Sequence, residues 1–136
     1  MVEQSKPRPV ADHDSQRFWD ACRDGQLIAQ RCEECGRWRW PPRGVCPGCG
    51  SWTFEWRELP GSGVVESFVV PHRAFNPAFA EDVPYVVVHV ALDGTDGQVV
   101  LISNFVGCEW QNVKVSLSVR VFFDLDEGSL PKFRPR

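Results

Sequence analysis

The sequence predicts a mainly β protein in which a short N-terminal helix and a four-cysteine metal ribbon precede a five-stranded barrel. Two Cys-x-x-Cys pairs stand ten residues apart between positions 32 and 49. From residue 60 onward the apolar runs are short, rich in β-branched and aromatic residues, and bounded by turn formers. We assign residues 1–29 to a lead and the helix, 30–59 to the ribbon, and 60–136 to the barrel with an extended C-terminal tail.

A short amphipathic helix is expected within the segment DSQRFWDACRDGQL. Asp12 or Asp14 can cap its N-terminus, and Gly25 is a typical C-terminal stop. Its apolar side would carry Phe18, Trp19 and Cys22. Such a face packs more often on its own protein than on a partner, so we expect it to contact the core.

Four cysteines in two closely spaced pairs match tetrahedral metal coordination, because each Cys-x-x-Cys turn presents both sulfurs to one side of an ion. The predicted ligands are Cys32, Cys35, Cys46 and Cys49. Each pair is followed by a glycine, Gly36 or Gly50, which can adopt positive φ and let backbone amides point at the sulfurs. In a reducing compartment this spacing indicates metal ligands rather than disulfides.

The predicted metal site has a structural role. A catalytic zinc keeps one coordination position open, whereas four cysteines fill all positions. Zinc in such a cage would contribute about 10–16 kcal/mol of apparent binding free energy to a ribbon with little core of its own. Iron in the same cage would instead give a rubredoxin and electron transfer, and the spacing alone does not separate the two metals.

The remaining cysteines and histidines do not indicate an active site. Cys22 and Cys108 are interpreted as small packed side chains, and His89 alternates with valines in a strand-like run. Together with His13 and His72 they form no Cys/His or Ser/His/Asp set that the sequence brings together. We therefore expect the isolated chain to have no catalytic activity.

Four apolar runs predict barrel strands, and a fifth strand is taken from the end of the ribbon. The four runs lie at 64–70, 85–92, 98–105 and 117–123, and the fifth at 53–59. A partly open five-stranded barrel covers most of the edges that so few strands would expose, and the OB-fold is its commonest form. The closing DEGSLPKFRPR contains two prolines and is predicted to be an extended tail.

Charge and hydropathy argue against two broad classes. The net charge is −3, and the chain has only three lysines, which is unlike a protein that neutralises nucleic-acid phosphates. No apolar run approaches the roughly 20 residues of a transmembrane helix, and the polar start MVEQSKPRPVADHD shows no apolar signal segment. We expect a cytoplasmic protein that does not enter a membrane.

The order of motifs resembles a known family in which a rubredoxin-like zinc ribbon is followed by an acyl-CoA-associated OB-fold. The likeness covers nearly the whole chain, through FWDA, GQLIAQRCEECGRWRWPPRGVCPGCGS, GSGVVESFVV, PYVVVHVALD, SNFVG and LPKFRP. Its most specific part is the ribbon followed by a Gly-x-Gly-Val strand. The chain departs from the family at Ser116, where a glycine is usual before the last strand, so the turn geometry there is in question.

The resemblance implies an accessory subunit. Family members typically accompany thiolase-like acyl-CoA enzymes, including thiolases, hydroxymethylglutaryl-CoA synthase assemblies and retro-aldol lyases, and the partner supplies the catalytic residues. The implied role is to dock on a thiolase-like subunit in a hetero-oligomer and to help bind the acyl-CoA thioester, with zinc as the structural ion.

Two segments offer candidate contacts with CoA or the partner. CoA presents phosphates, an adenine ring and a pantetheine arm, which suit arginine donors and an aromatic platform. The segment RWRWPPR contributes Arg37, Trp38, Arg39, Trp40 and Arg43. The loop PHRAFNPAFAEDVPY adds Phe75 and Phe79 as partner or acyl contacts. Alternatively, the tryptophans cover the metal and pack on the barrel, and the loop folds back on the barrel mouth.

Two other functions stay open at this point. Ribbons and OB barrels both bind single-stranded nucleic acid through aromatic stacking and basic grooves, which a salt-dependent gel shift would detect. A rubredoxin-like electron carrier would be red when oxidised, whereas a zinc protein is colourless.

Overall fold

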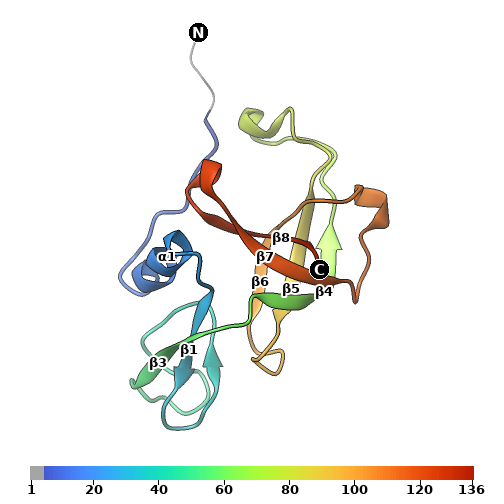
Figure 1. Cartoon of the computed structure of the whole chain (residues 1–136). Coiled ribbons are helices and arrows are strands. Elements are labelled where there is room, and N and C mark those ends of the chain that lie inside the picture. The colour runs from blue at the N-terminus through green and yellow to red at the C-terminus, as the bar shows by residue number, and fades with distance from the viewer. Residues whose placement is uncertain (1–4) are drawn as a thin grey trace.

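The computed structural model describes residues 5–136, so the first four residues of the predicted lead lie outside it. A helix with a small three-stranded sheet lies beside a closed five-stranded barrel (Figure 1). The mainly β fold class predicted from the sequence is confirmed. Within residues 5–136, no helix combines the length and the apolar character that crossing a bilayer requires.

The predicted helix is present as α1 (Gln16–Arg23) and ends where expected. Gly25 lies just beyond it with φ +75°, and its N–H donates to the carbonyl of Cys22. The predicted cap is wrong, because the N-cap residue is Ser15. Asp12 lies three residues before the N-cap, and its carboxylate accepts a hydrogen bond from the backbone N–H of Ser15 at 2.8 Å. Several neighbouring polar residues can start this helix, and only the backbone path selects one of them.

The ribbon sheet is antiparallel, with the order β2-β1-β3. Its strands are β1 (Ile28–Cys32), β2 (Trp38–Arg39) and β3 (Phe54–Glu58). β3 corresponds to the run 53–59 that the sequence analysis assigned to the barrel. That assignment is wrong, because β3 pairs with β1 along its whole length, from Ile28↔Glu58 to Cys32↔Phe54.

The barrel closes in the order β4-β5-β6-β8-β7. Its strands are β4 (Ser62–Val69), β5 (Val86–Leu92), β6 (Val100–Phe105), β7 (Ser118–Asp124) and β8 (Leu130–Pro135). Three short 3-10 helices lie in the connections: η1 (Pro77–Phe79), η2 (Trp110–Asn112) and η3 (Leu125–Glu127). The four runs predicted as barrel strands are all confirmed as strands.

The fifth barrel strand is β8, so the predicted extended tail is wrong. β8 pairs antiparallel with β7 along its length but shares only the parallel pair Phe105↔Phe133 with β6. Pro131 and Pro135 argued against a strand because proline cannot donate to a ladder. Both are tolerated because β8 has one almost unbonded side, while Phe133 between them is fully buried in the core.

Gly63 allows β4 to approach β5 closely inside the Gly-x-Gly-Val motif. A Cβ at this position would lie 2.5 Å from the carbonyl oxygen of Ala91 and 2.6 Å from Cγ1 of Val90. The carbonyl belongs to the paired strand β5 and cannot move without disturbing the ladder. The glycine is therefore a packing requirement of the barrel.

Ser116 adopts φ +75°, the left-handed conformation that glycine enters at little cost. Its N–H donates to the carbonyl of Val65 at 2.8 Å, beside the irregularity between Val65 and Ser67 in β4. The turn thus has the geometry that a glycine would favour, even though this chain carries serine.

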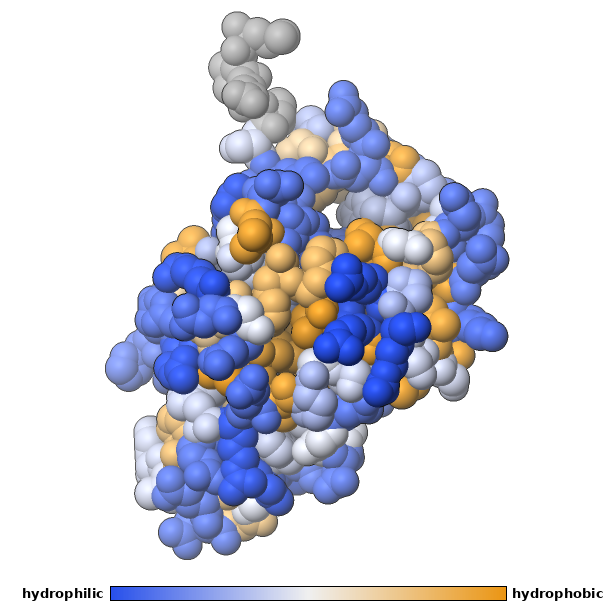
Figure 2. Space-filling model, viewed as in Figure 1, coloured by the Kyte–Doolittle hydropathy of each residue, from blue (hydrophilic) through white to orange (hydrophobic). Residues whose placement is uncertain are grey.

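One buried apolar core runs through the helix, the ribbon and the barrel. It includes Phe18 of α1, Trp38 of β2, and Val88 and Phe133 of the barrel. The backbone N–H of Trp38 also donates to Oε1 of Gln98 in the β5–β6 connection at 2.9 Å. Figure 2 shows hydrophobic residues gathered in the middle of this face, between the helical side and the barrel. Packing as well as chain connection therefore fixes the ribbon to the barrel.

Gly63→Ala is expected to lower the free energy of unfolding by about 2–4 kcal/mol, because the added methyl group overlaps a backbone carbonyl. The control is Gly97→Ala, since Gly97 has φ +73° and open space around the added Cβ. That variant should cost only about 1 kcal/mol of backbone strain. Urea unfolding followed by tryptophan fluorescence measures both changes, and equal losses would contradict the steric role of Gly63.

Candidate metal centre

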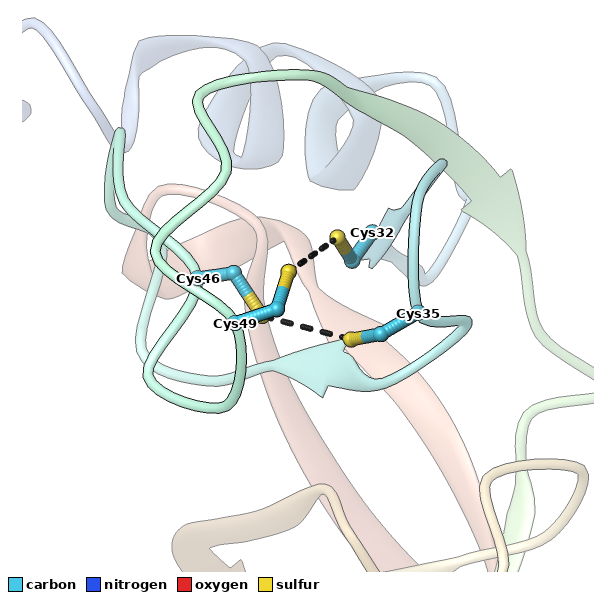
Figure 3. A group of neighbouring side chains, drawn as sticks. All are labelled: Cys32, Cys35, Cys46 and Cys49. Atoms are coloured by element: carbon cyan, nitrogen blue, oxygen red, sulfur yellow. Dashed lines mark hydrogen bonds between the residues drawn. The ribbon is translucent and has the colours of Figure 1, made fainter.

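Four cysteines converge on one point between β1 and the long loop that follows β2 (Figure 3). Cys32 is the last residue of β1, and Cys35 lies in the turn after it. Cys46 and Cys49 come from the loop between β2 and β3. All four Sγ atoms lie within 4.8 Å of one another. The structure therefore brings every predicted metal ligand together.

The sulfur separations fit tetrahedral coordination. The Sγ atoms of Cys32 and Cys49 are 3.6 Å apart, as are those of Cys35 and Cys46. A regular tetrahedron with metal–sulfur bonds of about 2.3 Å has sulfur–sulfur edges of about 3.8 Å. In the part of the chain that the structure describes, these cysteines form the single group of three or more possible metal ligands.

The first turn stabilises the thiolate of its leading cysteine. Gly36 and Gly50 both have φ +77°, which confirms the positive φ predicted after each cysteine pair. The backbone of the first turn folds back so that its amides face Cys32. The hydrogen bond from the amide of Cys35 is the main reason why the pKa of Cys32 falls to about 6. A lowered pKa favours the thiolate, which is the form that binds metals.

The backbone amides of the second turn likewise favour the thiolate of Cys46. The amide of Cys49 lowers the pKa of Cys46, and the N–H of Gly48 lies 3.4 Å from its sulfur. Cys49 itself differs. The Ser51 amide favours its thiolate, but desolvation and the three neighbouring thiols together raise the pKa of Cys49 to about 12. Four negative sulfurs repel one another at this spacing, and a bound cation would favour the thiolate of Cys49.

Arg39 holds the ligand loop from inside the ribbon. Its side chain is fully buried, and its guanidinium donates to the carbonyls of Gly44, Ser51 and Thr53 at 2.9–3.1 Å. The ring of Phe54 lies 4.8 Å from the guanidinium carbon. One side chain therefore connects both ends of the loop that carries Cys46 and Cys49.

The charge of Arg39 also suits a four-thiolate metal site. After the backbone amides, Arg39 contributes to lowering the pKa of Cys32. Its Nε is buried and has no hydrogen-bond partner within residues 5–136. Four thiolates on a divalent ion leave a net charge of about −2, which a buried guanidinium partly compensates. The donor set and its surroundings thus fit a tetrahedral divalent metal.

Two family models match the chain in succession. One, described as the ChsH2 rubredoxin-like zinc ribbon domain, matches residues 19–55, and the other, the ChsH2 C-terminal OB-fold domain, matches residues 56–124. The chain belongs to the ChsH2 family. The resemblance found in the sequence is thereby confirmed.

Two curated proteins are similar to this ChsH2-family chain in sequence. A probable enoyl-CoA hydratase alpha subunit of Thermomonospora curvata is 36% identical over 133 residues, which are 96% of this chain but 40% of that protein. A DUF35 domain-containing scaffold protein of Methanocaldococcus jannaschii is 32% identical over 118 residues, covering 80% of this chain and 81% of the relative. The chain thus spans less than half of the first relative and most of the second.

Two solved structures share the fold. A chain of the Ltp2-ChsH2(DUF35) aldolase has a TM-score of 0.81 and 34% identity, covering 94% of this chain and 98% of that one. A DUF35-family protein of unknown function from Sulfolobus solfataricus has a TM-score of 0.68 at 16% identity, covering 93% and 87%. The second similarity supports the fold alone.

The RWRWPPR segment of the ChsH2-family ribbon is divided between interior and surface. Trp38 and Arg39 are buried, and Trp40 packs edge-on against Phe18 with 5.0 Å between ring centroids. Arg39 has no exposed surface to offer to CoA or a partner, so its burial contradicts that predicted role. The tryptophans pack on their own protein, Trp38 in the common core and Trp40 on α1, which differs from the alternative that both cover the metal and pack on the barrel. Arg37 and Arg43 are exposed, and they stay candidate contacts.

The two loop candidates also differ in exposure. Phe75 is 87% exposed, with the guanidinium of Arg73 5.5 Å from its ring centroid. Phe79 is half-buried and faces Tyr85 at 6.1 Å and the ammonium of Lys6 at 5.5 Å. Phe75 therefore stays a surface candidate, whereas Phe79 takes part in packing around the barrel mouth.

A network of five charged residues was missed by the sequence analysis. Lys6 pairs with Asp82 and Glu127, and Lys132 pairs with Glu127 and Asp124, at 2.7–3.1 Å. The hydrogen bonds from Lys132 lower the pKa of both Asp124 and Glu127. The only signal in the sequence was a lysine among apolar residues in LPKF, because its acidic partners come from other segments.

The other thiols and histidines form no nucleophile–base pair within residues 5–136. Cys22 is buried, and desolvation raises its pKa to about 12, so it stays a thiol. Cys108 is exposed, and its thiol donates to the carbonyl of Glu109 at 3.5 Å. His72 packs edge-on against Trp110 with 5.0 Å between ring centroids. In residues 5–136 none of these three side chains is placed as a thiol next to a histidine base.

Arg39→Met is expected to lower the free energy of unfolding of the metal-loaded protein by about 3 kcal/mol or more, because three carbonyls of the ligand loop lose a charged, buried donor. Metal affinity should fall as well, since the sulfur cluster loses its nearby positive charge. Urea unfolding and competition with a chelator measure the two effects. The control is Arg43→Met, an exposed site where a change within about 0.5 kcal/mol is expected. Wild-type stability and affinity in Arg39→Met would refute the role of Arg39.

Proposed function

We propose that this chain is a non-catalytic subunit of an acyl-CoA enzyme of the thiolase or aldolase type, which docks on a thiolase-like partner and helps bind the CoA thioester. The observation that carries the proposal is the similarity, over 94% of the chain, to a chain of the Ltp2-ChsH2(DUF35) aldolase. The relative from Methanocaldococcus jannaschii is itself named a scaffold protein. Both support a role in assembly.

The metal centre supports a structural role for this subunit. A tetrahedral ion with four sulfur ligands has no position left for water or substrate. The buried thiol of Cys22 is too weakly acidic to act as a nucleophile at neutral pH. We therefore assign bond making and breaking to the partner, and a hetero-oligomer is the working form.

Zinc is the ion that we propose for the four cysteines. The matching ribbon model is described as a zinc ribbon, and the sulfur separations suit the metal. Bound zinc would cross-link the two turns of a ribbon that has few core residues of its own. A cytoplasmic location accords with this role, because paired cysteines stay reduced there.

The purified protein is expected to be colourless and to contain zinc in an amount equal to the chain. Removing the metal with a chelator should destabilise the ribbon, because metal binding supplies folding free energy there. Elemental analysis and the visible spectrum identify the metal, and circular dichroism follows the loss of structure. Bound iron with a red oxidised form would overturn the zinc assignment and favour the electron carrier.

Three exposed residues are the contacts that we propose for the complex. Arg37 and Arg43 present guanidinium groups on the ribbon surface, which suit the phosphates of CoA. Phe75 presents an exposed ring on the barrel loop, which suits an apolar contact with the partner. The buried Arg39 and Trp38 are no longer part of this set.

Co-expression with a thiolase-like partner is expected to yield a complex that turns over acyl-CoA, whereas the isolated chain turns over none. In the complex, Arg37→Glu with Arg43→Glu should weaken CoA-thioester binding about tenfold or more, because two phosphate donors become repulsive. The matched control is Arg17→Glu with Arg120→Glu, which reverses two exposed arginines elsewhere. Thioester turnover by the chain alone, or a stable monomer that binds no such partner, would sink the proposal.

A further inference from the structure

A cavity of about 620 Å³ opens at one end of the barrel. It lies among the segment 71–85, the connection after β6, and η3 with β8, and no residue of the ribbon lines it. Figure 2 shows the surface hollowed between these segments. The volume falls in the range of about 300–1,000 Å³ that is usual for small-molecule sites.

One wall of the cavity is aromatic. It consists of Phe79 and Tyr85 from the segment 71–85, Phe105 at the end of β6, and Trp110 in the connection after β6. The rings of Phe79 and Tyr85 stand 6.1 Å apart. An apolar ligand seated against this wall would remove its surface from water, which is the main source of affinity in such sites.

Both lysines that line the cavity are paired with carboxylates of the chain. The ammonium of Lys6 lies 2.7 Å from Asp82 and 3.1 Å from Glu127. The ammonium of Lys132 lies 2.7 Å from Glu127 and is also paired with Asp124. Each lysine among the lining residues thus has two carboxylate partners, which compensate its charge and weaken its attraction for an anionic ligand.

The net charge of the lining points in the same direction. Its two lysines face three carboxylates, those of Asp82, Glu109 and Glu127, and 2 − 3 leaves −1. A carboxylate or phosphate entering the cavity would meet repulsion and would lose its hydration without gaining a partner. An anionic ligand is therefore disfavoured in this cavity.

Asn104 supplies a polar anchor between the aromatic and charged parts. Its side-chain nitrogen donates to the carbonyl of Val86 at 3.3 Å, which leaves Oδ1 as an acceptor. A hydroxyl or amide N–H on the ligand can donate to this oxygen.

We propose that the barrel-end cavity binds an uncharged amphiphile, with an apolar chain against the aromatic wall and a hydroxyl or amide group at Asn104. This selectivity does not depend on the docking function, because it belongs to the isolated chain. If the docking function holds, the acyl end of a CoA thioester matches the cavity and its phosphates do not.

The test uses the full-length, metal-loaded chain and the exposed thiol of Cys108, which lines the cavity. Its alkylation by iodoacetamide is followed by mass spectrometry in the presence of 1-decanol or decanoate, two probes of equal chain length. Decanol is expected to slow the modification of Cys108 at least fivefold, and decanoate less than twofold. Equal protection by both probes, or none by decanol at its solubility limit, overturns the proposal.

Two pairs of variants sharpen the test. Phe79→Glu should abolish the protection by decanol, whereas Phe75→Glu should retain it, because Phe75 lies on the same segment but does not line the cavity. Asp82→Asn removes one partner of Lys6 and should increase the protection by decanoate severalfold, with decanol unchanged. Thermal melts check that each variant is folded. Retained protection in Phe79→Glu refutes the site, and a chain that fails here yet still joins its partner leaves the docking function intact.

Discussion

Four cysteine sulfurs lie within 4.8 Å of one another, and because their thiolate forms would repel one another, the ribbon depends on groups that compensate this repulsion. Backbone amides folded back by two left-handed glycines supply part of the compensation. The buried guanidinium of Arg39 supplies another part, and a metal ion held by the four sulfurs would complete it. Because the same guanidinium holds the carbonyls of the ligand loop, the electrostatics and the shape of the ribbon depend on one side chain.

The barrel contains a second buried cation, the ammonium of Lys132. Lys132 is 8% exposed and pairs with Glu127 and Asp124, and Glu127 in turn pairs with Lys6 of the lead. Arg39 and Lys132 lie in different parts of the chain, and each bonds to several groups of the chain itself. Both cations are thus largely engaged within the chain, whereas the guanidinium of Arg37 is exposed.

Sequence reasoning succeeded where the signal was local and failed where it was not. Each Cys-x-x-Cys-Gly turn carries its own geometry, so Cys32, Cys35, Cys46 and Cys49 could be assigned without knowing the fold. The sequence analysis placed the run 53–59 in the barrel and left the C-terminal tail out of it, whereas the structure shows the reverse. The partner of a strand depends on the whole sheet and not on the strand's own residues. The sequence of β3 does not indicate which sheet it joins. The prolines of β8 argued against a strand, but its sparsely bonded side tolerates them.

The sequence by itself determined the four cysteines of the candidate metal centre, the order of ribbon and barrel, and the absence of a strong basic charge, since these depend on spacing and composition. The family followed from the resemblance of its motifs to those of known proteins. Tertiary structure alone decided which side chains of RWRWPPR reach solvent, which segment closes the barrel, and which carboxylates meet Lys6 and Lys132. The physical reason is that burial and ion pairing are properties of contacts between distant segments. Lys6 and Glu127, 121 positions apart, become partners only when the barrel has closed.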